Sequence, residues 1–171
     1  MNVTLFCAIS ADGFIATSER NSEWISMEVD APIWEAEIKK RGCIIVGSKA
    51  FYQYLDDVYP FPEVQNIVIT SQTDRENKWD NVTFVEPDAS KALSVAESLG
   101  FPEVLLVGGA KTNGLFLKSG KVNGIILDIH PLLLGSGIKV FEDTDSRMIN
   151  LQKLSSQELS EGHTLLHYKV V

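Results

Sequence analysis

The sequence predicts a single-domain α/β fold: a mostly parallel central sheet with flanking helices and a C-terminal antiparallel hairpin. Short apolar segments bounded by turn-forming residues alternate with helical patterns, which is typical of a parallel sheet covered on both faces. Two closing segments follow each other without a helix between them, which indicates a hairpin at the sheet edge. The length of 171 residues suits one domain, expected to comprise residues 1–171.

The expected strands are short and either apolar or alternating, with turn formers at their edges. They are 3–9, 43–46, 66–70, 82–85, 104–107, 124–130 and 163–170. The segment "LQKLSSQEL" (151–159) is expected to pair with the last of them through a turn at Glu161-Gly162.

Three longer segments have helical patterns. Residues 30–41 place Ile33, Trp34 and Ile38 on one face. Residues 88–100 begin with Asp88 as a predicted N-cap and end at a glycine, and 112–120 is a shorter helix with a similar stop. A further short helix is expected after Gly47.

Composition and charge exclude several classes of protein. The hydrophobic fraction of 44% and charged fraction of 22% are ordinary for a globular protein, and no apolar run reaches the length of a membrane span. The N-terminal run has no basic leader, so we expect a cytoplasmic protein with no membrane partner. A net charge of −8 argues against a nucleic-acid binder and favours a small-molecule ligand.

Cysteine and histidine spacing gives no sign of a metal or redox centre. Cys7 and Cys43 both lie inside apolar stretches, and their spacing to each other and to the three histidines matches no metal or redox motif. We therefore expect buried thiols in a reducing compartment and no metal ion.

Three predicted strands end in turns whose chemistry suits phosphate. The turns are Gly47-Ser48-Lys49, Thr70-Ser71, which begins on the last residue of the predicted strand 66–70, and Gly108-Gly109. Each turn alone is equally compatible with an ordinary strand connection. In an open α/β sheet, however, ligands bind beyond the carboxyl ends of the strands, so three such turns together predict a nucleotide site. The second glycine would let a pyrophosphate approach the backbone closely.

Candidate residues for the reaction lie elsewhere along the chain. Trp24 either covers the core or lines a pocket for a flat ring, and Asp30 either caps the following helix or hydrogen-bonds a heterocycle and helps deliver a proton. Asp128 is a second candidate acid, because it shares a strand face with Ile126 and His130 in a sheet that should be buried. Burial would raise its pKa and let it hold a proton near neutrality.

The order of these motifs resembles that of the dihydrofolate reductase family and of the related C-terminal reductase domain of bacterial riboflavin-biosynthesis proteins. It comprises "SADGFIA", Trp24, "IIVGSK", "NIVITS", "VGGAKTN" and "HPLLLGSG", and runs through most of the chain. Asn113 and "LLGSG" (133–137) are more similar to the riboflavin branch.

The resemblance implies an NADPH-dependent reductase with a sheet of about eight strands. Ala8 and Ile15 would contact the nicotinamide through their backbone, and Trp24 would border both nicotinamide and substrate. The remaining cofactor residues divide into those meeting phosphates (Gly47, Ser48, Lys49), those near the adenosine 2′-phosphate (Thr70, Ser71) and those cradling the pyrophosphate (Gly108, Gly109, Ala110, Lys111, Thr112, Asn113). In this family the Gly108-Gly109 peptide is often cis.

Three positions depart from the family patterns. Ala50 replaces a phosphate-binding Thr, Val64 replaces the arginine that clamps the folate tail, and Val107 replaces a Glu common in the riboflavin branch. We therefore expect hydride transfer to a pteridine or to a riboflavin-pathway aminopyrimidine, with dihydrofolate a poor substrate. The alternative is a non-catalytic nucleotide-binding module that keeps the cofactor groove. By analogy with the riboflavin branch, a homodimer is expected.

Overall fold

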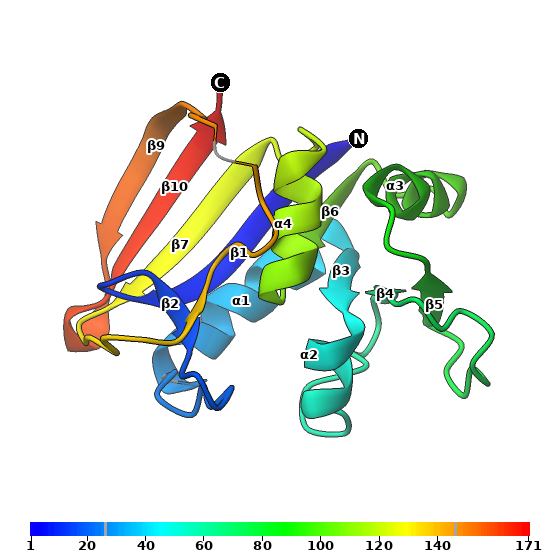
Figure 1. Ribbon diagram of the computed structural model, residues 1–171, viewed down its shortest axis with the longest axis horizontal. Coiled ribbons are helices and arrows are strands. Elements are labelled where there is room, and N and C mark those ends of the chain that lie inside the picture. The colour runs from blue at the N-terminus through cyan, green and yellow to red at the C-terminus, as the bar shows by residue number, and fades with distance from the viewer. Residues whose placement is uncertain (26, 146) are drawn as a thin grey trace.

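An eight-stranded sheet with the strand order β5-β4-β3-β6-β1-β7-β10-β9 runs through the molecule (Figure 1). The structure is a computed structural model, and it describes residues 1–25, 27–145 and 147–171. The strands are β1 (Asn2–Ser10), β3 (Cys43–Gly47), β4 (Gln65–Ile69), β5 (Val82–Val85), β6 (Glu103–Leu106), β7 (Gly124–His130), β9 (Leu151–Glu158) and β10 (Thr164–Val170). The first six of these pair in parallel, and β10 pairs antiparallel with both β7 and β9.

The predicted fold class, with its C-terminal hairpin, is therefore confirmed, and the strand bounds agree with the predicted ones to within two residues. A second, two-stranded sheet joins β2 (Phe14–Ala16) to β8 (Ile138–Lys139). The sequence patterns did not indicate it, because strands of two and three residues are too short to show a hydrophobic period.

Helices cover both faces of the large sheet. Side chains from α3 (Ala89–Ser98) and α4 (Ala110–Lys118) share one apolar cluster with the sheet. Side chains from α1 (Met27–Arg41) and α2 (Ser48–Gln53) join the cluster on the other face. Alternation along the strands divides the core: Ile45 packs toward α3 and α4, whereas Ile44 and Val46 pack toward α1 and α2.

Two helix predictions need correction at their starts. Helix α1 begins three residues before the predicted start at Asp30, so this residue lies in the first turn and does not cap the helix. Helix α4 begins at Ala110, directly after the double glycine and two residues before the predicted start. Helix α3 does begin after Asp88, whose side chain accepts hydrogen bonds from Ser90 N and Lys91 N.

Strand β9 forms an exposed edge of the sheet. All eight of its residues are exposed to solvent, and it pairs with β10 alone in the described part of the chain. The short 3₁₀ helix η1 (Ser160–Gly162) connects the two strands of this hairpin. Within the described residues, no helix combines the length and the apolarity that crossing a membrane requires.

Neither cysteine is disulfide-bonded, as expected from the sequence. Burial raises the pKa of both Cys7 and Cys43 to about 12. Neither thiol is therefore ionised near neutrality, which excludes both as ready nucleophiles.

Candidate active site

The three predicted turns lie at the carboxyl ends of the parallel strands β3, β4 and β6, which are neighbours in the sheet. A backbone hydrogen bond from Gly47 N to Gly108 O, with an N–O distance of 2.7 Å, joins the first turn to the third. A side chain at Gly47 would collide with the Thr112 hydroxyl at the start of α4. The two turns therefore form one continuous stretch of closely packed backbone.

The two glycines of the third turn differ in backbone conformation and in the space available for a side chain. Gly108 has φ of +101°, a conformation that side-chain-bearing residues rarely adopt, and its peptide bond to Gly109 is cis. Gly109 has φ of −76°, and a Cβ atom there would meet no protein atom within 4 Å. The backbone conformation therefore does not require a glycine at position 109, and a side chain there would meet no described atom of this chain.

The residues after the double glycine have unequal exposure. Ala110, Thr112 and Asn113 are buried. The Asn113 amide donates to Val140 O at 2.9 Å and packs beneath Gly108, so its side chain supports the turn from inside. Lys111 is exposed and forms an ion pair with Asp143 at 3.4 Å.

The turn after β4 carries a cation that sequence reasoning missed. Thr70 is buried and its hydroxyl accepts from Gln72 N at 3.1 Å, whereas Ser71 is exposed. Arg75 lies in the loop that follows, with its guanidinium 4.9 Å from the centre of the Tyr52 ring on α2. Arg75 also donates hydrogen bonds from Nε and Nη2 to Gln72 Oε1, so contacts with both Gln72 and Tyr52 hold it beside the turn. The signal in the sequence was only an arginine in a polar loop.

On the other side of the carboxyl edge, Asp12 joins two loops. Its carboxylate accepts from the Ser10 hydroxyl at 2.6 Å, and from Leu134 N and Gly135 N at 3.1 and 2.7 Å. The "SADGFIA" turn and the "LLGSG" segment therefore pack as a unit, with Ile15 half-buried on β2. Ala8 lies on β1 directly beside Asp128 of β7.

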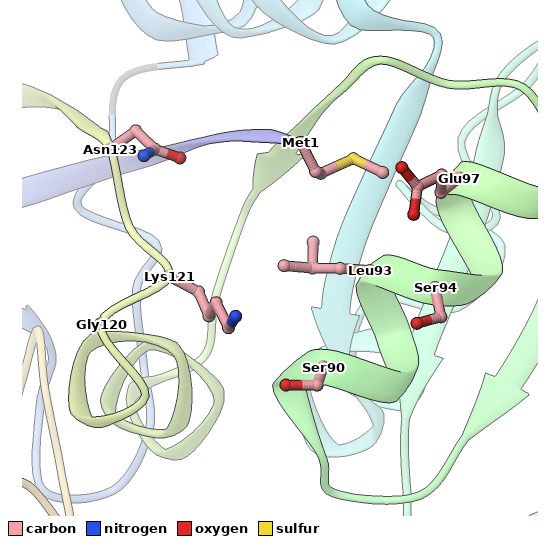
Figure 2. Close-up of a pocket in the computed structure, with 8 residues that line it drawn as sticks. All are labelled: Met1, Ser90, Leu93, Ser94, Glu97, Gly120, Lys121 and Asn123. Atoms are coloured by element: carbon pink, nitrogen blue, oxygen red, sulfur yellow. The ribbon is translucent and has the colours of Figure 1, made fainter.

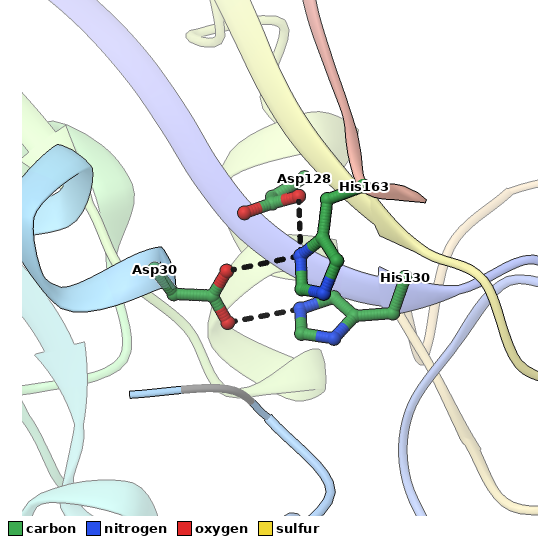
Figure 3. Close-up of side chains that lie close together, drawn as sticks. All are labelled: Asp30, Asp128, His130 and His163. Atoms are coloured by element: carbon green, nitrogen blue, oxygen red, sulfur yellow. Dashed lines mark ion pairs between the residues drawn. The ribbon is translucent and has the colours of Figure 1, made fainter. Parts of the chain in front are cut away.

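A buried cluster of two aspartates and two histidines lies next to this unit (Figure 3). Asp30 comes from the first turn of α1, Asp128 and His130 from β7, and His163 from the residue before β10. Each of the four is at most 4% exposed. We refer to these four residues as the Asp–His cluster.

Close approaches join all members of the cluster. His130 Nε2 lies 2.9 Å from Asp30 Oδ2. His163 Nδ1 lies 3.5 Å from Asp30 Oδ1 and also 3.5 Å from Asp128 Oδ1 (Figure 3). His163 therefore stands between the two carboxylates.

The two carboxyl groups have pKa values shifted in opposite directions. Burial, and then the neighbouring Asp30, raise the pKa of Asp128 to about 8. Burial also acts to raise the pKa of Asp30, but the contacts with His130 and Asp128 and the nearby His163 lower it below its usual value. A proton held by the pair at neutral pH therefore resides on Asp128, as its predicted burial implied.

Trp24 lies against the cluster. Its ring meets the His130 ring edge-on, with centroids 5.0 Å apart, and its indole Nε1 is buried with no hydrogen-bond partner among the described residues. The structure thus brings together Trp24, Asp30 and Asp128, which the sequence had singled out separately. His163 was missed, because its place at the start of the last strand carries no motif and only the β7–β10 pairing brings it to Asp128.

A separate cavity of about 290 Å³ lies at the opposite, amino edge of the sheet (Figure 2). It lies apart from the candidate site, because ligands of open α/β sheets bind at the carboxyl edge of the strands. Its lining residues are Met1, Ser90, Leu93, Ser94, Glu97, Gly120, Lys121 and Asn123.

Comparison with known proteins agrees with this architecture. The model of the RibD C-terminal domain matches residues 1–60 and 61–165. The riboflavin biosynthesis protein RibD of Corynebacterium ammoniagenes is 28% identical over 81% of this chain, which spans 45% of that protein. YyaP of Bacillus subtilis is 26% identical over 97% of this chain and 93% of its own length.

Solved structures share the fold. The structure of a Shewanella sp. PV-4 protein assigned to riboflavin biosynthesis superposes with a TM-score of 0.86, at 20% identity, over 100% of this chain and 99% of that one. At this level of identity the likeness concerns the fold alone.

Proposed function

Because the chain belongs to the RibD C-terminal domain family, we propose that it is an NADPH-dependent reductase that transfers hydride to a flat nitrogen heterocycle. The substrate we propose is a pteridine or an aminopyrimidine of the riboflavin pathway, similar to 5-amino-6-(5-phosphoribosylamino)uracil. The family match covers nearly the whole chain, and the RibD relative that it resembles is a riboflavin biosynthesis protein.

The open backbone at Gly109 is the observation that carries the cofactor proposal. A dinucleotide pyrophosphate needs unobstructed backbone at the start of a helix, where N–H groups and the helix dipole favour an anion. Gly109 N-caps α4 and has free space in front of it, and the hydrogen-bonded turn at Gly47 adjoins it. Ser48 and Lys49 then contribute a hydroxyl and a cation at the start of α2.

The same edge supports a preference for NADPH over NADH. Thr70 and Ser71 would lie near the 2′-phosphate, and Arg75 adds a guanidinium that can pair with it in bidentate fashion. Charge-assisted contacts of this kind are made only by the phosphorylated cofactor.

The heterocycle would lie beside Trp24, with its polar edge toward Asp30. When bound, NADPH supplies the hydride, and Ala8 and Ile15 present their backbone to the nicotinamide. Trp24 provides an apolar wall for a flat ring, while Asp30 and Asp128 are the carboxyl groups available to orient the ring and pass a proton to it. Burial of the cluster excludes bulk water from that proton.

The positions that depart from the family patterns bear on the choice of substrate. Val64 is 5% exposed and packs in the core cluster of α1 and α2, so it has no role in holding an acidic substrate tail. Dihydrofolate is accordingly proposed to be a poor substrate. Val107 and Ala50 also pack against this cluster, and they are the positions that favour the rival function, a non-catalytic nucleotide-binding module.

The exposed edge strand supports a homodimer. Leu151 and Leu154 of β9 are 42% and 62% exposed, and Met148 just before them is 89% exposed. An exposed strand edge with apolar side chains is a surface that a second chain can cover. We propose that a second copy of this chain does so.

Isothermal titration with NADPH and NADH tests the proposed cofactor. The expected result is clearly tighter binding of NADPH, with Arg75→Gln losing most of the preference and retaining NADH binding. Equal dissociation constants for the two nucleotides, or an Arg75→Gln variant that keeps the full preference, would contradict this assignment of the 2′-phosphate site. Absence of binding by either nucleotide would contradict the reductase itself.

A further inference from the structure

The Asp–His cluster contains the donor atoms of a metal site. Two carboxylates and two imidazole nitrogens, contributed by three elements, place one ligand atom each within 4.8 Å of all the others (Figure 3). These donors belong to segments far apart in the chain, so spacing along the sequence did not indicate them.

Three distances between donor atoms of the cluster are close to those around a tetrahedral ion, and the four donors lie within 4.8 Å of one another. Zinc bonds to imidazole nitrogen and carboxylate oxygen are about 2.0–2.2 Å long, which puts neighbouring ligands of a tetrahedral site about 3.3–3.5 Å apart. His163 Nδ1 lies 3.5 Å from an oxygen of each aspartate. His130 Nε2 lies 2.9 Å from Asp30 and needs a shift of only a few tenths of an ångström.

The donor atoms have no partners outside the cluster. Both oxygens of Asp30 and Asp128, together with His130 Nε2 and His163 Nδ1, are buried, and within the described parts of the chain their polar contacts are only the close approaches among these four residues. Buried polar atoms are nearly always satisfied, and those of native proteins that are not call for an ion or a water molecule. One donor atom of each of the four residues faces a common small volume, where a single cation can bind all four.

Charge favours the same occupant. Two ionised carboxylates carry two negative charges, which one divalent cation neutralises, and two neutral imidazoles complete the coordination. Imidazole ligands favour zinc and similar transition ions over magnesium and calcium, which take oxygen ligands.

We propose that Asp30, Asp128, His130 and His163 bind one divalent transition-metal ion per chain, with zinc the best-fitting ion. The site goes beyond the proposed reductase activity and does not depend on it, since all four ligands come from this chain without nucleotide or substrate. An ion bound there requires both carboxylates ionised and both imidazoles neutral, so protons compete with it and binding weakens as the pH falls. Metal content therefore has to be controlled in any test of proton transfer by these residues.

Cobalt titration of the chelator-treated full chain tests the proposal. Co²⁺ in a tetrahedral nitrogen and oxygen site gives intense visible absorption, and calorimetry gives the stoichiometry. We expect saturation at one ion per chain and displacement of Co²⁺ by Zn²⁺. Absence of saturable binding by the unmodified chain overturns the proposal, whatever the variants do.

Two ligand variants and a matched control locate the ion. His163→Gln and Asp128→Asn should each bind Co²⁺ at least tenfold more weakly, whereas His167→Gln should bind as the unmodified chain does. His167 is the remaining histidine of the chain and lies in β10 outside the cluster. Unchanged affinity in both ligand variants, or loss of binding in His167→Gln, overturns the assignment.

Two further measurements separate the possible causes of failure. Circular dichroism of each variant shows whether it is folded, and weaker binding counts as support only in a variant that is. Titration of the same samples with NADPH shows the nucleotide site independently. If the chain binds NADPH but no ion, the metal proposal fails and the proposed reductase function stands.

Discussion

Asp30 belongs both to the proposed reductase site and to the proposed metal site. Its carboxylate enters the protein interior from the first turn of α1 and lies close to both His130 and His163, while Trp24 packs against the far side of His130. A capping role would have left this carboxylate at the helix end. Its burial against two histidines favours a chemical role, because an ionised group is costly to bury without partners.

Replacing Asp30 by Asn should separate chemistry from cofactor binding. In metal-free protein we expect NADPH affinity to stay nearly unchanged, because Asp30 is on α1 and the pyrophosphate turn precedes α4. Turnover should fall on the order of 100-fold or more, because the amide cannot pass a proton. Tryptophan fluorescence quenching by NADPH and initial rates would measure the two effects. An equal loss in both would show that the residue acts through the fold.

Asp12 predicts a pH dependence of stability. The Ser10 hydroxyl, and also Gly135 N and Leu134 N, lower the pKa of Asp12 below its ordinary value of 3.8. A carboxyl group whose pKa is lowered on folding stabilises the protein above its unfolded pKa and loses that contribution as the pH falls through its folded pKa. Asp12→Asn should therefore be less stable than the unmodified chain at pH 7.

Denaturant melts at several pH values check this sign. The difference in free energy of unfolding between the unmodified chain and Asp12→Asn should shrink as the pH falls below 3.8. A difference that is constant, or that grows toward acid pH, would show that the loop contacts do not depend on the charge.

The sequence could predict individual site residues only where they belong to a motif. Gly108-Gly109 and Thr70 follow predicted strands, so a shared sheet edge follows from topology. Arg75 and His163 have no such signal. Arg75 is held by hydrogen bonds to Gln72 and a ring contact with Tyr52, and His163 is placed by the pairing of β7 with β10. Those contacts exist only once the chain has folded.

At the level of elements, α4 and the turn before it carry two glycines with opposite requirements. A Cβ atom at Gly109 would point into free space, whereas at Gly114 it would overlap the Glu142 carbonyl oxygen. Gly114 is therefore required for close packing of α4 against the backbone at Glu142, whereas Gly109 is not required by packing.

The variants Gly109→Ala and Gly114→Ala should accordingly fail in different ways. Gly109→Ala should change the free energy of unfolding by less than about 1 kcal/mol but weaken NADPH binding at least tenfold, because its methyl group occupies the pyrophosphate's space. Gly114→Ala should lose on the order of 3 kcal/mol of stability through the backbone overlap. Thermal melts and calorimetric titration would measure both. Normal NADPH binding by Gly109→Ala would show that the double glycine only forms a turn and does not contact the cofactor.

Element bounds were predictable where hydrophobic patterning is strong. The buried strands β3 and β4 differ from prediction by one residue or less at each end, since every residue of β3 is buried. The start of α1 was predicted three residues late, because an aspartate such as Asp30 is a typical N-cap residue. The β2–β8 pair was missed because it is stabilised by tertiary contacts such as those of Asp12 rather than by its own pattern.

At the scale of the whole molecule, the exposed hairpin edge predicts the assembly. If a second copy covers β9, the unmodified chain should be dimeric in solution and Leu154→Lys should be monomeric. Leu99→Lys is a matched control, because Leu99 is 49% exposed at the end of α3, away from the hairpin. Light scattering after size exclusion would measure the mass. A monomeric unmodified chain, or a dimer that survives Leu154→Lys, would contradict the proposed interface.

The candidate functional residues gather at one edge of the sheet. Phosphate-compatible turns, the Asp–His cluster and the loop joined by Asp12 all lie at or beside the carboxyl edge of the strands, while the cavity lined by Met1, Glu97 and Lys121 lies at the opposite edge. This location agrees with the place where open α/β sheets bind their ligands.

The most direct test is NADPH oxidation by metal-free protein with a panel of pterins and aminopyrimidines, including phosphoribosylated ones, followed by absorbance of the reduced nicotinamide. We predict enzyme-dependent oxidation with at least one member of the panel, slow or no turnover of dihydrofolate, and loss of the activity in Asp30→Asn. Tight NADPH binding without oxidation by any member of the panel would contradict the account and identify the protein as a nucleotide-binding module.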